Sequence, residues 1–276
     1  PVVGALLQDA AGARIITGCI VTGATYQSNR FIIKSNIGDF SADSLVIATG
    51  GMSFATLGVS DIGYKIAKSF GHKIIPIRPA LCAIDTPAFP REWAGISVGA
   101  QITVKERKIT GDMLFTHFGI GGPAVYSASI ATSDCDIKIN LMPGIDVNDW
   151  LRQAKRSAGR KALSTVLGER LPNQIAKYFG GPARNIADFR DSELSDVAAR
   201  ITDITLHAGT WHHHGMAAAE VTFGGVDTAD ISSKTMESKI QPGLFFAGEV
   251  MDITGDLGGF NLHWAWASGH VAGDNA

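Results

Sequence analysis

The feature that most limits the fold of this chain lies near its end, where a short apolar run is followed by an acid and a pair of glycines. Leu244–Ala247 form a run typical of a buried parallel strand. Gly248-Glu249 would end this strand with a carboxylate at its carboxyl edge, which is where open α/β sheets bind ligands. Gly258-Gly259 permit close backbone approach, and a helix is predicted from near Asn261. The free N–H groups at that helix start would face the same crevice.

The predicted helix has small residues on one side. Ala265, Gly269 and Ala272 are spaced by four and three residues, so we expect this face to press closely on a sheet. Taken without the rest of the chain, these residues fit a ligand site and an ordinary β-loop-α unit equally well.

A second buried strand is predicted from Leu45 to Gly51, because Leu-Val-Ile-Ala is continuously apolar and ends in Thr-Gly-Gly. Residues 19–25 and 31–35 are β-type runs separated by polar turns, which indicates a meander that leads into this strand. A helix is predicted from about Asp61, its natural N-cap. That helix start would face the crevice beside Gly50-Gly51.

The remaining segments indicate a second domain and an insertion. Residues 74–90 are rich in proline and predict a domain crossing, and residues 99–104 alternate as a half-buried strand does. Residues 146–204 have helical periodicity with a locally basic outer face, for which solvation is the favoured interpretation. We therefore predict one domain from residues 1–77 and 226–276, a β-rich domain from residues 78–145 and 205–225, and a helical insertion at residues 146–204.

Composition is that of a globular protein, with 45% hydrophobic and 18% charged residues among 276. The net charge of −2 gives no reason to expect a nucleic acid or an anionic membrane as partner. No apolar run approaches the roughly 20 residues that a membrane helix needs. Cys19, Cys82 and Cys135 are widely spaced, which fits a reducing compartment and gives no metal site. We expect a cytoplasmic protein with a small-molecule substrate.

The opening Pro1-Val-Val-Gly has no initiator Met and none of the basic or apolar segments of a signal peptide. We expect the chain to be a fragment of a longer protein.

Three motifs invite functional interpretations that the sequence does not favour. Gly119-Ile-Gly-Gly-Pro-Ala124 matches a dinucleotide fingerprint, but Pro123 removes an N–H at the helix start, so we interpret it as a decoy. Trp211-His-His-His-Gly215 has no acid or cysteine at zinc spacing, and on a strand His212 and His214 would share a face while His213 points away. We expect a polar loop that lines a substrate opening. His117 is a candidate proton donor, although a histidine bonded to backbone in a tight turn is the favoured alternative.

Several stretches together resemble the middle of the BaiN-type (aminoacetone-oxidase-like) bacterial NAD(P)/FAD-dependent oxidoreductases. The matching stretches run in order along nearly the whole chain: residues 45–54, 61–67, 71–74, 79–81, 111–124, 219–226, 235–239 and 248–269. The resemblance implies an α/β fold with a two-dinucleotide-fold (Rossmann-like) FAD domain, incomplete at its N-terminus, plus a β-rich domain and a helical insertion. It also implies FAD as cofactor and NAD(P)H as a possible electron donor.

The resemblance assigns cofactor contacts to residues that match the family's motifs. These are Thr49, Gly50, Gly51, Ser53, Asp61, Gly248, Glu249, Gly258, Gly259, Phe260, Asn261 and Leu262. In the family the acid holds the ribityl hydroxyls, and the last helix start faces the pyrimidine edge of the flavin. The loop Ser53–Gly58 would lie near the flavin or its substrate face. The family's opening strand, its G-x-G-x-x-G turn and the ribose-binding acid are missing here, so we expect this chain alone to bind FAD weakly or not at all.

The resulting hypothesis is a FAD-dependent oxidoreductase that passes hydride through the flavin, with His117 as its proton-transfer candidate. A catalytically silent binding or scaffold module derived from the same fold is the alternative. A nicotinamide-only dehydrogenase that uses Gly119–Ala124 ranks last. The sequence does not identify the substrate, the choice between NADH and NADPH, or the oligomeric state.

Overall fold

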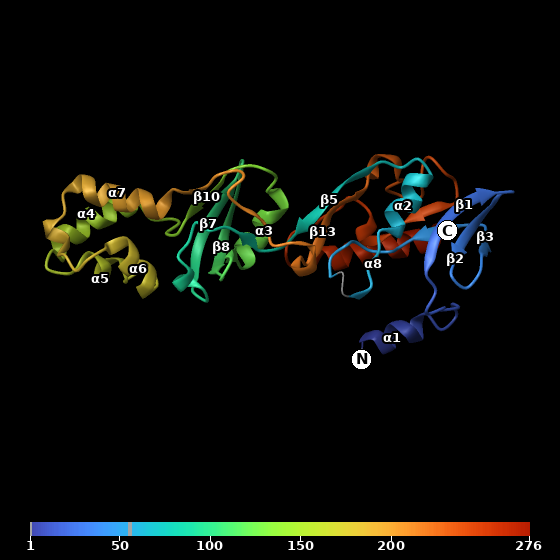
Figure 1. Cartoon of the computed structure of the whole chain (residues 1–276), viewed down its shortest axis with the longest axis horizontal. Helices are drawn as coiled ribbons and strands as arrows, with labels where there is room; N and C mark the ends of the chain where they lie inside the picture. The colour runs from blue at the N-terminus through green and yellow to red at the C-terminus, as the bar shows by residue number, and fades with distance from the viewer. Residues whose placement is uncertain (1, 55–56) are drawn as a thin grey trace.

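The computed structural model describes residues 2–54 and 57–276 and has three parts in a row (Figure 1). An α/β part lies at one end and contains the early strands β1 to β4 and the last helix α8, whereas helix α1 lies apart from it. A seven-stranded antiparallel sheet lies in the middle, and helices α4 to α7 form the other end. The antiparallel ribbon of β5 (Ile74–Ala80) and β13 (Val221–Val226) joins the first two parts.

The α/β part contains the two parallel strands that the apolar runs predict. β4 (Leu45–Ile47) pairs in parallel with β14 (Leu244–Phe246), with Leu45 opposite Leu244. All three residues of β14 are buried, as expected for a strand covered on both faces. The predicted meander is also present and contains a strand that the sequence did not indicate. Its strands are β1 (Val21–Gln27), β2 (Arg30–Ser35) and the unpredicted β3 (Phe40–Ala42).

Helix α2 (Ile62–Ser69) begins where predicted, but Asp61 does not cap it with its side chain. The Asp61 carboxylate instead pairs with Lys65, one turn further on, at 2.8 Å. Ser60 provides the local cap, because its hydroxyl oxygen accepts the N–H of Ile62 at 3.1 Å. The predicted capping role of Asp61 is therefore wrong, and that of its neighbour was missed.

Helix α8 (Phe260–Asn275) packs through a face that shares only Ala272 with the predicted one. Ala265 and Gly269 are exposed, whereas Ser268 and Ala272 are buried. The reason is a polar contact: the Ser268 hydroxyl accepts the N–H of Gly248 at 2.9 Å and so ties the helix to the end of β14.

The middle sheet has the strand order β11-β10-β7-β8-β9-β6-β12, and neighbouring strands pair antiparallel. Ala100, Ile102 and Val104 of β7 are completely buried, as their alternation predicts. Helix α3 (Pro123–Ala131) packs against β7 and β8. The strands are β6 (Ile84–Asp85), β7 (Ser97–Val104), β8 (Arg107–Phe115), β9 (Gly119–Gly121), β10 (Ile137–Asn140), β11 (Ile204–Leu206) and β12 (His212–His213).

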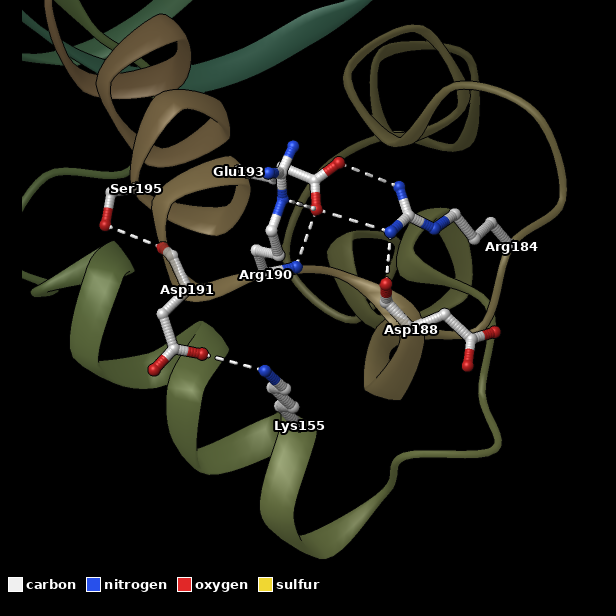
Figure 2. A network of polar contacts seen from close by, with 7 residues as sticks. All are labelled: Lys155, Arg184, Asp188, Arg190, Asp191, Glu193 and Ser195. Atoms are coloured by element: carbon white, nitrogen blue, oxygen red, sulfur yellow. Dashed lines mark hydrogen bonds and ion pairs between the residues drawn. The ribbon is translucent and has the colours of Figure 1, made fainter.

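The helical end consists of α4 (Val147–Ser157), α5 (Leu163–Leu167), α6 (Asn173–Gly180) and α7 (Asp191–Thr202). Its apolar side chains belong to the same hydrophobic cluster as those of the middle sheet. Figure 2 shows the ion pairs that hold its outer face: Glu193 accepts from Arg184 at 3.0 Å and from the N–H of Arg190 at 2.6 Å, and Lys155 bonds Asp191 at 2.8 Å. These contacts fix α4, α7 and the loop between α6 and α7 in one arrangement.

Short elements complete the described chain. Helix α1 (Val2–Asp9) has no buried residue. The 3-10 turns are Arg91–Trp93, Ile186–Asp188, Met216–Ala218, Thr228–Asp230 and Gly248–Val250. In the described residues, none of the helices has both the length and the apolar character to span a bilayer.

Candidate functional site

The candidate site forms where β4 and β14 end side by side. Because the two strands are parallel and in register, Gly51 and Glu249 meet although 198 residues separate them in the sequence. The carboxyl edge of parallel strands is the usual ligand position in open α/β sheets. The predicted strand-end acid is therefore at the expected edge.

The carboxylate of Glu249 joins three segments of the chain. Its Oε1 accepts the N–H of Thr222 at 2.6 Å, and its Oε2 accepts the N–H of Gly51 at 3.2 Å. Burial raises the pKa of this carboxyl group, and the two backbone hydrogen bonds act in the opposite direction. Glu249 thereby fixes the end of β4 against β13 in addition to any role toward a ligand.

Thr222 is a residue of this site that sequence analysis missed. Its hydroxyl oxygen accepts the N–H groups of Met52 at 2.7 Å and Ser53 at 3.2 Å, so it holds the loop that follows β4. Gly51 makes this contact possible: a Cβ there would lie 2.4 Å from Thr222 Oγ1 and 2.7 Å from Glu249 Cδ. The stretch that contains Thr222 matches the family, but its spacing says nothing about a partner 169 residues away.

A cavity of about 320 Å³ opens beside Glu249 at the start of α8. Five predicted cofactor residues line it: Glu249, Gly258, Gly259, Asn261 and Leu262. The other lining residues are Leu81, Glu220, Val221, Asp256, Leu257 and Ala265. The cavity thus lies between the ribbon β5–β13 and the last helix, and two segments remote in sequence form it.

The backbone at the start of α8 leaves donors free for a ligand. Gly259 has a φ of +90°, and no atom lies within 4 Å of the position that its Cβ would take. No side chain caps the helix, and in residues 2–54 and 57–276 the N–H groups of its first three residues, 260–262, have no acceptor. The Asn261 side chain is already used, because it exchanges hydrogen bonds of 2.8 and 3.0 Å with the backbone of Gly255. Of the polar hydrogens of Asn261, only the backbone N–H remains for a ligand.

The other predicted cofactor residues do not line this cavity. Thr49 directs its hydroxyl at α2, because a Cβ on Gly63 would lie 2.1 Å from Thr49 Oγ1. Gly50 has a φ of +73°, and Ser53 is buried beside Thr222. Gly248 is buried at the end of β14, whereas Phe260 is 61% exposed. Within the predicted loop Ser53–Gly58, positions 55 and 56 lie outside the described residues.

The groups at this cavity fit a flavin nucleotide. Each oxygen of Glu249 accepts one N–H and keeps capacity for a second donor such as a ribityl hydroxyl. Outside the lining of the cavity, the buried hydroxyl of Tyr64 on α2 has no partner within the described chain, and burial followed by the charge of Glu249 raises its pKa to about 12. It therefore keeps its proton at neutral pH. The cavity volume lies at the lower end of the roughly 300–1,000 Å³ typical of ligand sites, so it has room for only a part of a dinucleotide.

His117 and the histidine triplet lie at a different cavity, in the middle sheet. It is lined by His117 and His212 together with Asp85 and Phe118, and it shares no lining residue with the Glu249 cavity. As the alternation predicts, His212 and His214 both face Asp85, whereas His213 turns to Thr132 at 2.8 Å. No group of three metal-ligating side chains occurs among the described residues.

The glycine motif at residues 119–124 has a packing role. A Cβ on Gly119 would lie 2.2 Å from the carbonyl oxygen of Ile84, and one on Gly122 would lie 3.0 Å from that of Asp112. The glycines therefore allow β9 and the start of α3 to lie against neighbouring strands.

Comparison with known proteins adds an independent observation. The sequence profile of a protein family described as "HI0933-like protein Rossmann domain" matches residues 1–275. The chain is 35% identical over 278 residues to a ribosomal RNA dihydrouridine synthase of Haemophilus influenzae, which covers 95% of this chain and 68% of that protein. It is 35% identical over 250 residues to a protein of the same name from Escherichia coli, covering 86% of this chain and 62% of that one. It is 30% identical over 286 residues to a 3-dehydro-bile acid delta(4,6)-reductase of Clostridium scindens, covering 94% and 68%. The chain spans about two thirds of the length of these relatives.

Proposed function

Because the chain belongs to the HI0933-like protein Rossmann domain family, we propose that it carries the flavin-facing part of a FAD-dependent oxidoreductase. The observation that supports this most is the cavity at Glu249, where the predicted cofactor residues of the last helix meet the strand-end acid. We further propose NAD(P)H as the electron donor. A reducing, cytoplasmic location is part of the same proposal, because Cys19, Cys82 and Cys135 are all free thiols.

The names of the relatives suggest one reaction class. A dihydrouridine synthase adds two hydrogens to the C=C bond of uracil that is conjugated with a carbonyl group. A delta(4,6)-reductase of 3-dehydro bile acids also acts on C=C bonds conjugated with a carbonyl group. We therefore propose reduction of an electron-poor C=C bond: hydride adds to the carbon β to the carbonyl, and a proton adds to the α carbon.

The chain's own residues would bind and orient the reactants. A bound flavin supplies the hydride chemistry. Glu249 would accept hydrogen bonds from ribityl hydroxyls, and the free N–H groups at the start of α8 would stabilise negative charge on an electron-rich ligand. Leu81, Leu257 and Leu262 would exclude water from the cavity. The proposed role of His117 in proton transfer remains a prediction, because His117 lies at the other cavity.

For the substrate, we propose a uracil base within an RNA. Two relatives at 35% identity carry ribosomal RNA in their names. This proposal departs from the expectation of a partner other than nucleic acid, which rested on net charge, because net charge does not report where charges lie on a surface. A small conjugated ketone is the second candidate, and the relative at 30% identity favours it.

The test is an assay with excess FAD and NAD(P)H. Mass spectrometry would follow the gain of two hydrogens by a uridine-containing transcript or by a small conjugated ketone. We expect Glu249→Gln to weaken flavin binding and Glu220→Gln to leave it unchanged, because the exposed Glu220 lines the same cavity without bonding β4. Absence of any change in the flavin spectrum and of any reduced product would refute the proposal and favour the silent binding module.

A further inference from the structure

The second cavity, in the middle sheet, has features that the proposed reaction does not use. It has a volume of about 380 Å³ and lies beside β6, β9 and β12. Two motifs without a role in the flavin site meet there: the turn around Phe118 and the histidine triplet. Its lining residues are Asp85, Thr86, Pro87, Phe89, Arg91, Thr116, His117, Phe118, Gly119, Thr210 and His212.

Asp85 fixes two imidazole rings at the edge of this cavity. Its Oδ1 lies 2.7 Å from His214 Nδ1, and its Oδ2 lies 3.1 Å from His212 Nε2. Only 19% of the Asp85 side chain is exposed. Since a carboxylate only accepts hydrogen bonds, each ring donates an N–H to it and is held in one orientation.

The fixed ring of His214 supports an exposed phenylalanine. The rings of His214 and Phe118 stack with centroids 3.8 Å apart and an angle of 11° between their planes. Phe118 is nevertheless 41% exposed, so His214 covers one face of its ring and leaves the remainder open. The backbone of Phe118 is also fixed, because its carbonyl oxygen accepts the N–H of Thr86 at 2.9 Å. The result is a rigid, flat aromatic surface at the wall of a cavity.

Cationic and hydrogen-bonding groups surround this aromatic surface. Arg91 is exposed at the cavity and has no ion-pair partner in the portion of the chain that the structure describes. His117 is exposed as well, whereas the Thr210 hydroxyl already donates to the carbonyl oxygen of His207 at 2.7 Å. A planar ligand with carbonyl or phosphate oxygens matches this combination of a stacking surface and donors.

We infer that this cavity holds one unpaired base of the substrate RNA, stacked on Phe118, with Arg91 and His117 at its phosphate or carbonyl oxygens. Proteins that read RNA stack unpaired bases on aromatic side chains in this manner. The inference rests on the proposed RNA substrate, since an enzyme that acts on a base must take it out of its stack. The bound base is a different one from the reduced uracil, because the two cavities share no lining residue. Asp85 and His214 act as positioning residues that hold Phe118.

The test uses a single-stranded oligoribonucleotide that contains 2-aminopurine, whose fluorescence falls when the base stacks. We expect binding with quenching for the unmodified protein and for Phe118→Tyr, which keeps an aromatic ring. Phe118→Leu is expected to bind about 5- to 150-fold more weakly and to lose the quenching. The control is Tyr26→Leu, which removes a ring of similar exposure, 38%, on β1 and is expected to change neither quantity. Thermal unfolding of each variant verifies that it is folded.

Two outcomes would overturn the inference: no RNA binding by the unmodified protein, or equal affinity and quenching for Phe118→Leu. Asp85→Asn provides a second test, since loosening His214 should weaken RNA binding and the quenching while the spectrum of added FAD is unchanged. Failure of the proposed function would give a different experimental result from failure of this inference. The flavin spectrum would then not respond to any conjugated substrate, whether or not RNA binds at Phe118.

Discussion

Replacing Gly51 with alanine tests the contact that joins the two remote segments of the candidate site. The added Cβ would lie 2.4 Å from Thr222 Oγ1 and 2.7 Å from Glu249 Cδ, far inside contact distance, so one of them must move. Overpacking costs about 1–3 kcal/mol, and loss of a hydrogen bond to a charged group costs about 1.5–3 kcal/mol. The backbone angles of Gly51 lie outside the left-handed region, so alanine fits them without strain. Alanine also lowers the conformational entropy of the unfolded chain, which stabilises the fold by about 0.4–1 kcal/mol. We expect a net loss of about 1.5–5.5 kcal/mol in the free energy of unfolding.

Urea unfolding of Gly51→Ala, Thr222→Ala and the double variant measures this effect. Removing the hydroxyl of Thr222 takes away the nearest atom, so the second substitution should recover part of the cost of the first. Gly50→Ala is the control: its φ of +73° costs about 1–2 kcal/mol in backbone strain, and no neighbour lies within 4 Å, so Thr222→Ala should give no recovery. The reasoning is refuted if Gly51→Ala is as stable as the unmodified chain, or if the two substitutions simply add.

Three further predictions concern other contacts. Burial lowers the pKa of His72, so below pH 6.5 the unfolded chain takes up a proton that the folded chain does not, and the free energy of unfolding should fall as pH drops. His72→Gln should reduce this dependence of stability on pH, which unfolding at a series of pH values measures. Hydrogen bonds from Arg184 and Arg190 lower the pKa of Glu193 to about 2, so its carboxylate contributes stability that is present above pH 4.5 and lost as pH falls toward 2 (Figure 2). Glu193→Gln should therefore speed amide exchange in α7 at neutral pH. Arg78 donates to the Ser129 and Ile130 carbonyls at 3.0 and 2.6 Å, so Arg78→Met should cost about 1.5–3 kcal/mol in thermal unfolding.

Sequence analysis located the elements that depend on local pattern. The apolar runs at residues 45–47 and 244–246 became the parallel strands, and the alternation in residues 99–104 became a strand with one buried face. The histidine triplet also alternates as predicted, because strand geometry alone sends His213 to the opposite side. These patterns are visible because each depends on neighbours within a few positions.

The features that were missed depend on contacts between remote segments. The prediction for the packed face of α8 is correct for Ala272 and wrong for Ala265 and Gly269. The reason is that Ser268 bonds Gly248, and no helical periodicity reveals that partner. Thr222 and Tyr64 were overlooked for the same reason: their roles come from Gly51, Met52 and Glu249. Strand β3 is only three residues long and has a serine at its centre, so its composition resembles that of the turns around it. Most of the features that the sequence did not predict therefore depend on polar contacts between segments remote in the sequence.

The most direct test of the central claim is an NMR titration of the ¹⁵N-labelled chain with FAD up to millimolar concentration, where weak binding is still visible. The account predicts shifts of the amide signals of Gly51, Thr222 and residues 258–262, and it predicts that Glu249→Gln removes them. Shifts confined to the cavity at Phe118, or shifts that Glu249→Gln leaves unchanged, would contradict the assignment of the Glu249 cavity to the flavin.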